Sequence, residues 1–318
     1  MNAPLSIAVL GAGSIGSLFA AKLAGAGHDV TMIVRNEARR AYLREHGLVT
    51  RSRLTGRVDT VRVGLEPALR HTYDLVLVAV QRPHIDALVP TLAANDSRAI
   101  MLMFNCASGA DQWAGDLGAD RLLWGFPAVL ADLQDQVLEY AVVPAALRFV
   151  QITTIGTLDG RETPTLTAVR EAFGGAGIPT TVDADIDAWL KTHAAYMAPI
   201  MAMGYVPPPG RFGPRLRWSD ARALAAAMRT AFAAIRATGV GLTPGNMRFL
   251  DRLPAAALTG LLWTVFWSPM AKRSLSSHSG AAPGEVAMLL AELEFLALGA
   301  GVDPTPLRAL AVQVPTDA

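Results

Sequence analysis

A glycine pattern near the start of the chain constrains the fold more than any other feature. An apolar run that predicts a strand, residues 7–10, is followed by the spacing G-x-G-x-x-G and then by a helix-like stretch. Gly11 permits a tight turn, Gly13 lets the backbone approach a pyrophosphate, and Gly16 lets the helix lie close to the strand. The amides at the start of that helix can bind phosphate oxygens. The pattern predicts a Rossmann-type domain; the alternative is a glycine-rich turn in another α/β fold. The cofactor contacts predicted here are Gly11, Gly13, Ser14, Ile15 and Gly16.

The end of the second predicted strand indicates which dinucleotide is bound. This strand ends in Arg35 and Asn36 rather than in an acidic residue. A carboxylate would bind a ribose 2′-hydroxyl, whereas arginine can hold a 2′-phosphate with two hydrogen bonds. NADPH is therefore expected rather than NADH, unless Arg35 is only a solvated strand-end residue. Arg82 is a second candidate near the adenosine end.

The first half of the chain alternates apolar runs with amphipathic stretches, as in a parallel sheet with crossover helices. The other strand candidates are residues 30–34, 60–63, 75–80, 100–104 and 179–182, with a helix at 163–173. Strand-like runs at 122–127, 137–143 and 149–155 are separated by polar turns, which predicts antiparallel pairing as an extension of the sheet. The fold class expected is α/β, with an N-terminal Rossmann-type doubly wound sheet.

After residue 183 the chain becomes rich in Ala, Leu and Met at helical spacing, interrupted by prolines. We expect a Rossmann domain over residues 1–183 and an all-helical substrate and dimerisation domain over 184–318. The longest apolar run, 255–267, is shorter than the ~20 residues of a membrane span. It predicts a buried helix.

Composition excludes several functions. Apolar residues make up 52% of the chain and the net charge is +1 without basic runs, so neither nucleic acid nor a membrane is an expected partner. The apolar surface suggests a homodimer. The single cysteine, Cys106, and the absence of room for a signal peptide before the first strand favour the cytoplasm. No His, Cys and carboxylate grouping has metal-site spacing, so no metal is expected.

The sequence resembles the ketopantoate reductase (2-dehydropantoate 2-reductase) family as a divergent member. The resemblance covers the glycine pattern, Arg35, the strand-end Asn105, the segment Trp189-Leu190-Lys191 and the closing Ala-Gly-Val-Asp-Pro. It implies NADPH as hydride donor and a 2-keto acid reduced in an interdomain cleft. By this resemblance Asn105 lies near nicotinamide and substrate, and Lys191 donates a proton to the developing alkoxide.

The sequence departs from this family at several polar positions. Ala195 replaces one asparagine that contacts substrate, and a second is replaced around Ala198 and Pro199. The late acidic motif is reduced to one glutamate, Glu285, the candidate substrate-binding carboxylate. Gln81 stands where the family has a lysine at the 2′-phosphate. Because polar contacts for ketopantoate are lost, ketopantoate itself becomes a doubtful substrate.

Composition gives Lys191 independent support, because the chain has only three lysines, Lys22, Lys191 and Lys272, against 25 arginines. Lysine can lose its proton when partly buried, which arginine cannot do in practice. The alternative is an ordinary surface lysine.

Further substrate candidates are Tyr196 and His278, the latter with a capping or loop role as an equal alternative. His193 is expected to pack in the core or at its rim. Three aromatic residues and a methionine are clustered: Trp263, Phe266, Trp267 and Met270. The cluster is predicted to form core, a dimer contact or the wall of a pocket for a less polar substrate.

The function expected is NADPH-dependent reduction of a 2-keto acid or related ketone. The first alternative is a dinucleotide-binding homologue with little catalysis that acts as a sensor or interaction protein. A dehydrogenase working in the oxidative direction uses the same residues, so the sequence does not separate it from a reductase.

Overall fold

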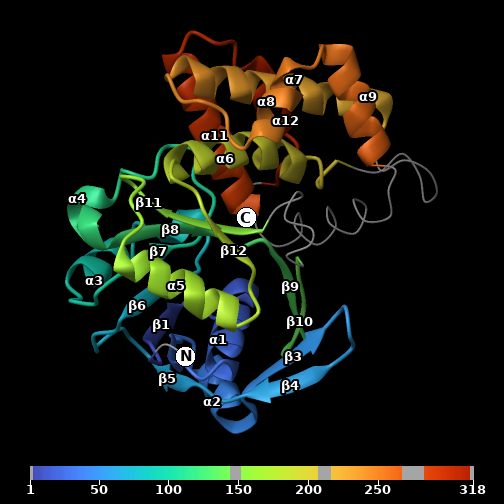
Figure 1. Ribbon diagram of the computed structural model, residues 1–318. Coiled ribbons are helices and arrows are strands. Elements are labelled where there is room, and N and C mark those ends of the chain that lie inside the picture. The colour runs from blue at the N-terminus through green and yellow to red at the C-terminus, as the bar shows by residue number, and fades with distance from the viewer. Residues whose placement is uncertain (1–2, 144–151, 207–215, 267–282, 316–318) are drawn as a thin grey trace. The chain divides into compact units, whose positions relative to one another are not determined.

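The computed structural model describes residues 3–143, 152–206, 216–266 and 283–315 (Figure 1). The chain divides into two compact units. The sheet unit comprises Met1–Phe104 and Ala110–Ile186, and the helical unit comprises Asn105–Gly109 and Asp187–Ala318. The helical unit is therefore built from two stretches that are far apart in the sequence.

The main sheet of the sheet unit contains eight strands. They are β1 (Ser6–Leu10), β2 (Asp29–Ile33), β5 (Gly64–Glu66), β6 (Leu75–Val78), β7 (Ile100–Leu102), β8 (Leu122–Phe126), β11 (Thr153–Thr157) and β12 (Thr180–Val182). Their order is β12-β11-β8-β7-β6-β1-β2-β5, and every neighbouring pair is parallel except β8 and β11. The run from β5 to β8 has the 3-2-1-4-5-6 order of a dinucleotide-binding sheet. Together with the helical unit, this confirms the predicted fold class.

Helices connect the parallel strands. They are α1 (Ser14–Gly25), α2 (Glu37–His46), α3 (Val89–Ala93), α4 (Ala114–Leu117) and α5 (Pro164–Gly175), with 3₁₀ turns at Arg82–His84 and Ala119–Arg121. Asn36 caps α2 by accepting a hydrogen bond from Arg39 N (2.9 Å), and Thr163 caps α5 in the same way through Leu166 N (3.1 Å). The predicted helix at 163–173 is thus confirmed, and its start is fixed by a threonine cap.

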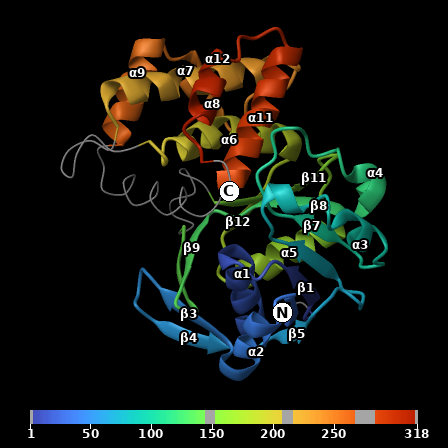
Figure 2. The same cartoon turned by 180° about the vertical axis from the view of Figure 1, so that it is seen from behind.

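A second sheet of four strands was not predicted. It contains β3 (Leu48–Ser52), β4 (Val58–Val61), β9 (Val129–Gln134) and β10 (Val137–Val142), in the order β4-β3-β10-β9. Helix α1 contacts all four of these strands as well as β1 and β2, and it lies beside the small sheet in both Figure 1 and Figure 2. One helix is therefore shared by both sheets of this unit.

The second sheet corrects two predictions. The strand expected at 60–63 is replaced by β4 in the small sheet and β5 in the main sheet, because the chain passes between the sheets there. Antiparallel extension of the main sheet was wrong for one of the three runs, because β10 joins the small sheet. β8 and β11 pair antiparallel with each other in the main sheet, as expected, while the other edge of β8 pairs parallel with β7. Residues 149–151 of that run lie outside the described residues.

The helical unit contains no strand among its described residues. Its helices are α6 (Ile186–Ala202), α7 (Trp218–Ala237), α8 (Gly245–Arg252), α9 (Ala255–Val265), α11 (Pro283–Gly299) and α12 (Thr305–Ala311). Helix α7 contacts α9, α11 and α12, and its buried alanines let these helices pack closely at the centre of the core. No described helix combines the length and apolar character needed to cross a membrane.

The prediction of a buried helix at 255–267 was wrong in part. In α9 only Leu258, Thr259 and Leu262 are buried, while Leu261 and Val265 are 39% and 46% exposed. The run is apolar on every side, so it contains no polar face that would reveal which side meets solvent. Trp263 packs against Trp218 and Phe266 is buried. Trp267 and Met270 lie outside the described residues.

Candidate active site

The turn between β1 and α1 needs glycine at two positions. Gly11 has a φ of +112°, and a β-carbon there would lie 2.2 Å from the carbonyl oxygen of Ala79. A β-carbon on Gly16 would lie 1.8 Å from the carbonyl oxygen of Gly11. Both distances are far below van der Waals contact, so these glycines let α1 begin directly against the end of β1.

Gly13 differs from its neighbours, because a β-carbon there would meet no atom within 4 Å. Its backbone borders open space at the N-terminus of α1. No side chain caps this helix and its first turn holds no acidic residue. The amides of Ser14, Ile15 and Gly16 are therefore available for an anion. These residues fit the pyrophosphate of a dinucleotide.

Three arginines follow β2. Arg35 is exposed and has no acidic partner in the part of the chain that the structure describes. Arg39 donates to Gln136, and Arg40 pairs with Glu37 and donates to the carbonyl of Val34 (2.7 Å). The Arg35 guanidinium is thus available to bind a phosphate.

Arg82 has a different environment. It is buried, its guanidinium lies 4.7 Å from the centre of the Trp113 ring, and its Nη1 is 3.6 Å from the Asp86 carboxylate. Trp113 Nε1 donates to the same carboxylate (3.0 Å). These contacts with Trp113 and Asp86 hold the Arg82 side chain within the sheet unit. They favour a structural role for Arg82 over contact with adenosine.

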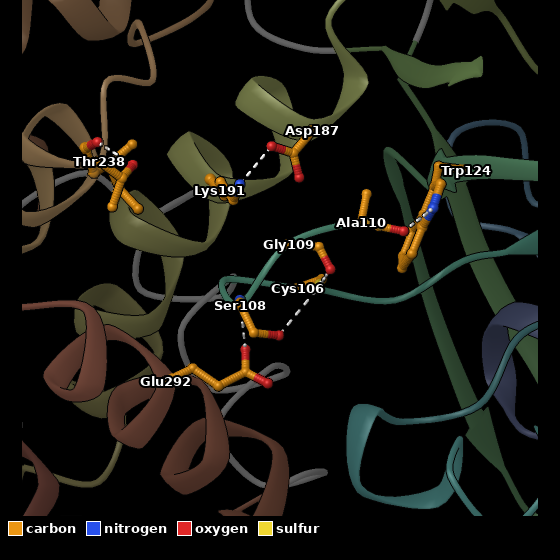
Figure 3. Close-up of polar contacts among 10 residues, drawn as sticks. Cys106, Ser108, Gly109, Ala110, Trp124, Asp187, Lys191, Thr238 and Glu292 are labelled. Carbon is orange, nitrogen blue, oxygen red and sulfur yellow. Dashed lines mark hydrogen bonds and ion pairs between the residues drawn. The ribbon is translucent and has the colours of Figure 1, made fainter. Parts of the chain in front are cut away.

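Within the helical unit, the segment Asn105–Gly109 is held by two glutamates of α11. Asn105 Nδ2 donates to Glu285 Oε1 (3.2 Å). Glu292 Oε2 accepts from the backbone N–H groups of Ala107 (3.0 Å) and Ser108 (3.2 Å), the latter drawn in Figure 3. Two residues that the family resemblance assigns to the reacting groups, Asn105 and Glu285, are therefore brought together.

Burial raises the pKa of the Glu285 carboxyl above its ordinary value, and the hydrogen bond from Asn105 opposes this shift. Asn105 Oδ1 is buried and accepts no hydrogen bond from the described residues. The pair thus presents an unused acceptor and a carboxyl that holds its proton to higher pH than an exposed glutamate. Such groups can bind a polar substrate.

Lys191 lies on α6, one turn after Asp187. Its Nζ is 2.5 Å from Asp187 Oδ2, and the two side chains are 15% and 28% exposed (Figure 3). The carboxylate fixes the direction of the lysine side chain. A partly buried, oriented ammonium can donate a proton.

Two residues of this arrangement were missed by sequence reasoning. Asp187 is recognisable in retrospect, because a carboxylate four residues before a lysine on a helix is the favoured i,i+4 pair. Glu292 has no such local signal, since its partners, Ala107 and Ser108, are 185 and 184 residues away and use backbone groups.

The remaining candidates on α6 are packed inside the helical unit. His193 is buried and stacked on Trp189, with ring centres 4.9 Å apart, and burial lowers the pKa of its imidazole to about 3. It is therefore neutral, as expected of a core residue. Burial also raises the pKa of the Tyr196 phenol, which packs against the helical core.

Ala195, which replaces one family asparagine, and Ala198, which lies where the second is replaced, are fully buried in the helical core. His278 lies outside the described residues. Among those described, no group of His, Cys, Asp and Glu could hold a metal ion.

Comparison with known proteins supports the family assignment. Residues 7–137 match the family model described as ketopantoate reductase PanE/ApbA, which confirms the resemblance over the sheet unit's first part. This is a family of oxidoreductases that act on a carbonyl or hydroxyl group with a nicotinamide cofactor. No curated protein matches the sequence significantly.

Solved structures resemble the whole chain. The 2-dehydropantoate 2-reductase of Geobacter metallireducens is 16% identical with a TM-score of 0.75, covering 98% of this chain and 99% of that one. The enzyme of the same name from Methylococcus capsulatus is 18% identical with a TM-score of 0.71, covering 97% and 95%. A D-mandelate dehydrogenase with NADH and anilino(oxo)acetate is 12% identical with a TM-score of 0.72, covering 97% of each chain. At these identities the likeness shows the fold.

Proposed function

We propose that this chain, whose residues 7–137 match the ketopantoate reductase family model, is an NADPH-dependent reductase of a 2-keto acid. The observation that carries the proposal is the hydrogen bond between Asn105 and Glu285. These residues are 180 positions apart. The family resemblance assigns Asn105 to the reacting groups and makes Glu285 the candidate substrate-binding carboxylate. Their contact supports a polar substrate site at this place.

NADPH is the proposed cofactor. The open space at Gly13 and the free amides at the start of α1 suit the pyrophosphate, and Arg35 suits the 2′-phosphate. When bound, the nicotinamide supplies the hydride that reduces the carbonyl carbon. These residues of the sheet unit support the proposal of NADPH rather than NADH.

The helical unit supplies the polar chemistry. Reduction of a ketone leaves negative charge on oxygen, and the Lys191 ammonium stabilises that charge and donates a proton from Nζ to the oxygen. Lysine is then neutral and regains its proton from water, while Asp187 keeps the side chain in place. Asn105 and Glu285 orient the substrate through hydrogen bonds.

The substrate is proposed to be less polar than ketopantoate. Ala195 and Ala198 offer no hydrogen bonds where the family has asparagines. The fold is also that of a D-mandelate dehydrogenase whose structure contains anilino(oxo)acetate, an aromatic 2-keto acid derivative. Aryl and branched alkyl 2-keto acids are therefore the first compounds to test.

The test is a steady-state assay of wild type and Lys191→Met with ketopantoate, aryl and alkyl 2-keto acids, following the loss of NADPH absorbance. We expect kcat of the variant to fall by ~10²- to 10⁴-fold, the usual contribution of a positioned proton donor, with the Kd for NADPH unchanged. Lys22→Met, which removes a lysine from the sheet unit, is the matched control and should keep full activity. Tight NADPH binding without turnover of any compound would instead favour the sensor function.

A further inference from the structure

A cavity of about 630 Å³ lies in the sheet unit, separate from the glycine turn. One wall is the second half of α1, from Leu18 to Ala26, and the other is formed by β3, β4 and β10 and the end of α5. No residue of the turn at 11–16 lines it. Lys22 is eight residues beyond the start of α1, a distance of about 12 Å along the helix. The volume is that of a small-molecule site, which typically measures ~300–1,000 Å³.

Small residues keep this cavity open. Helix α1 presents Ala21, Gly25 and Ala26 to it, and α5 ends there in Gly175. A β-carbon built on Gly25 or Gly175 would meet no atom within 4 Å. The space between α1 and the small sheet is therefore left unfilled because the facing positions carry almost no side chain.

One positive charge in the cavity is unbalanced. Lys22 Nζ lies 4.9 Å from the centre of the Tyr140 ring, and no carboxylate of the described residues pairs with it. The other two charged lining residues, Arg57 and Asp59, pair with each other at 2.8 Å. The lining thus has a net charge of +1, which is carried by Lys22, one of the chain's three lysines. Lysine and tyrosine together hold that charge at a fixed place.

The rest of the lining is mixed. Thr50 and Ser52 are buried on the wall made by β3, and Ser52 Oγ accepts from Thr55 N (3.3 Å), which leaves its O–H able to donate. Leu54 and Val142 line it with apolar surface that is not buried. A ligand that fits must combine an anionic group with an apolar body.

We propose that this cavity binds a small organic monocarboxylate. Its carboxylate contacts the Lys22 ammonium and its apolar body packs against Leu54 and Val142. A monoanion balances the single net charge, whereas a phosphate monoester would bring a second negative charge with no cation to meet it. The site is independent of the proposed reductase activity and uses none of its residues.

The test is a titration of the full-length protein with benzoate, naphthoate and octanoate, followed by the backbone amide signals of Gly25 and Gly175. At least one carboxylate is expected to shift these signals, equally with and without saturating NADPH. Lys22→Met should weaken carboxylate binding about tenfold or more, the usual effect of losing a charged hydrogen bond, and leave weak binding of benzyl alcohol unchanged. Arg70→Met, which removes an exposed charge outside the cavity, should bind as wild type.

Two adjacent glycines at the end of α5 provide a matched pair for filling the cavity. Neither Gly174 nor Gly175 would place a β-carbon within 4 Å of another atom, but only Gly175 lines the cavity. Gly175→Leu should reduce binding at least about tenfold by occupying the space, and Gly174→Leu should leave it unchanged. If Gly175→Leu does not fold, judged by circular dichroism, the Lys22→Met titration decides.

The proposal is overturned if none of the three carboxylates shifts these signals, or if NADPH displaces them. It is equally overturned if Lys22→Met binds carboxylates as wild type or if the two leucine variants behave alike. Tighter binding of phenyl phosphate than of benzoate would reject the monocarboxylate.

Discussion

At the residue scale, Glu285 combines a buried carboxyl with a hydrogen bond from Asn105. Because its folded pKa is raised, ionising it costs stability, so the protein loses stability as pH rises from the ordinary glutamate pKa through the raised value. Glu285→Gln removes this titration and keeps an oxygen that accepts from Asn105. At pH 8 we expect the variant to be more stable than wild type, with a free energy of unfolding higher by about 1.4 kcal/mol for each unit of pKa shift and a higher melting temperature. At pH 4 we expect the two proteins to be equally stable. Thermal unfolding at both pH values checks this; an equal difference at both would contradict it.

Arg35 is the residue on which the choice of dinucleotide depends. Arg35→Gln should raise the Kd for NADPH by ~10- to 100-fold, the equivalent of a lost charged hydrogen bond to phosphate, and leave the Kd for NADH unchanged. Arg44→Gln, an equal loss of charge on the exposed side of α2, is the control. Fluorescence titration measures both constants. Equal weakening of the two dinucleotides would show that Arg35 does not contact the 2′-phosphate.

At the element scale, the β1–α1 turn separates a glycine needed for folding from one needed for binding. Gly16→Ala places a methyl group 1.8 Å from a carbonyl oxygen, so it should destabilise the protein by several kcal/mol. Gly13→Ala meets open space and should keep the wild-type melting temperature while binding NADPH at least about tenfold more weakly. Calorimetry and dinucleotide titration on both variants check this. A Gly13→Ala protein that binds NADPH normally would place the pyrophosphate elsewhere.

The segment Asn105–Gly109 depends on Glu292 for its conformation. Glu292→Ala leaves the amides of Ala107 and Ser108 without this acceptor, so their hydrogen exchange should accelerate. Because Asn105 heads the same segment, kcat/KM should fall while the Kd for NADPH stays the same. Glu294→Ala, which removes a carboxylate that pairs with Arg308, is the control. Unchanged exchange at Ala107 and Ser108 would show that the loop keeps its shape without Glu292.

At the scale of the whole molecule, the features predicted correctly are those whose signals are local. The β1–α1–β2 unit follows from a glycine spacing and two apolar runs, and the helical domain follows from composition and proline positions. The small sheet could not be predicted, because β3 ends in the polar residues Thr50, Arg51 and Ser52 and pairs with β10, some 88 residues later. The contacts of Glu285 and Glu292 with the 105–109 segment are equally non-local. The homodimer, the cytoplasmic location and the substrate stay predictions.

The division of the helical unit into two separate stretches has a consequence for its folding on the ribosome. Asn105–Gly109 is synthesised long before α11, whose Glu285 and Glu292 bind it. At about 5–20 residues per second, some 180 residues take roughly 10–40 s to emerge. During that interval the chain beyond β7 lacks the carboxylates of Glu285 and Glu292 that bind it in the folded protein. The helical unit can therefore close only after almost the entire chain has been made, however early the sheet unit folds.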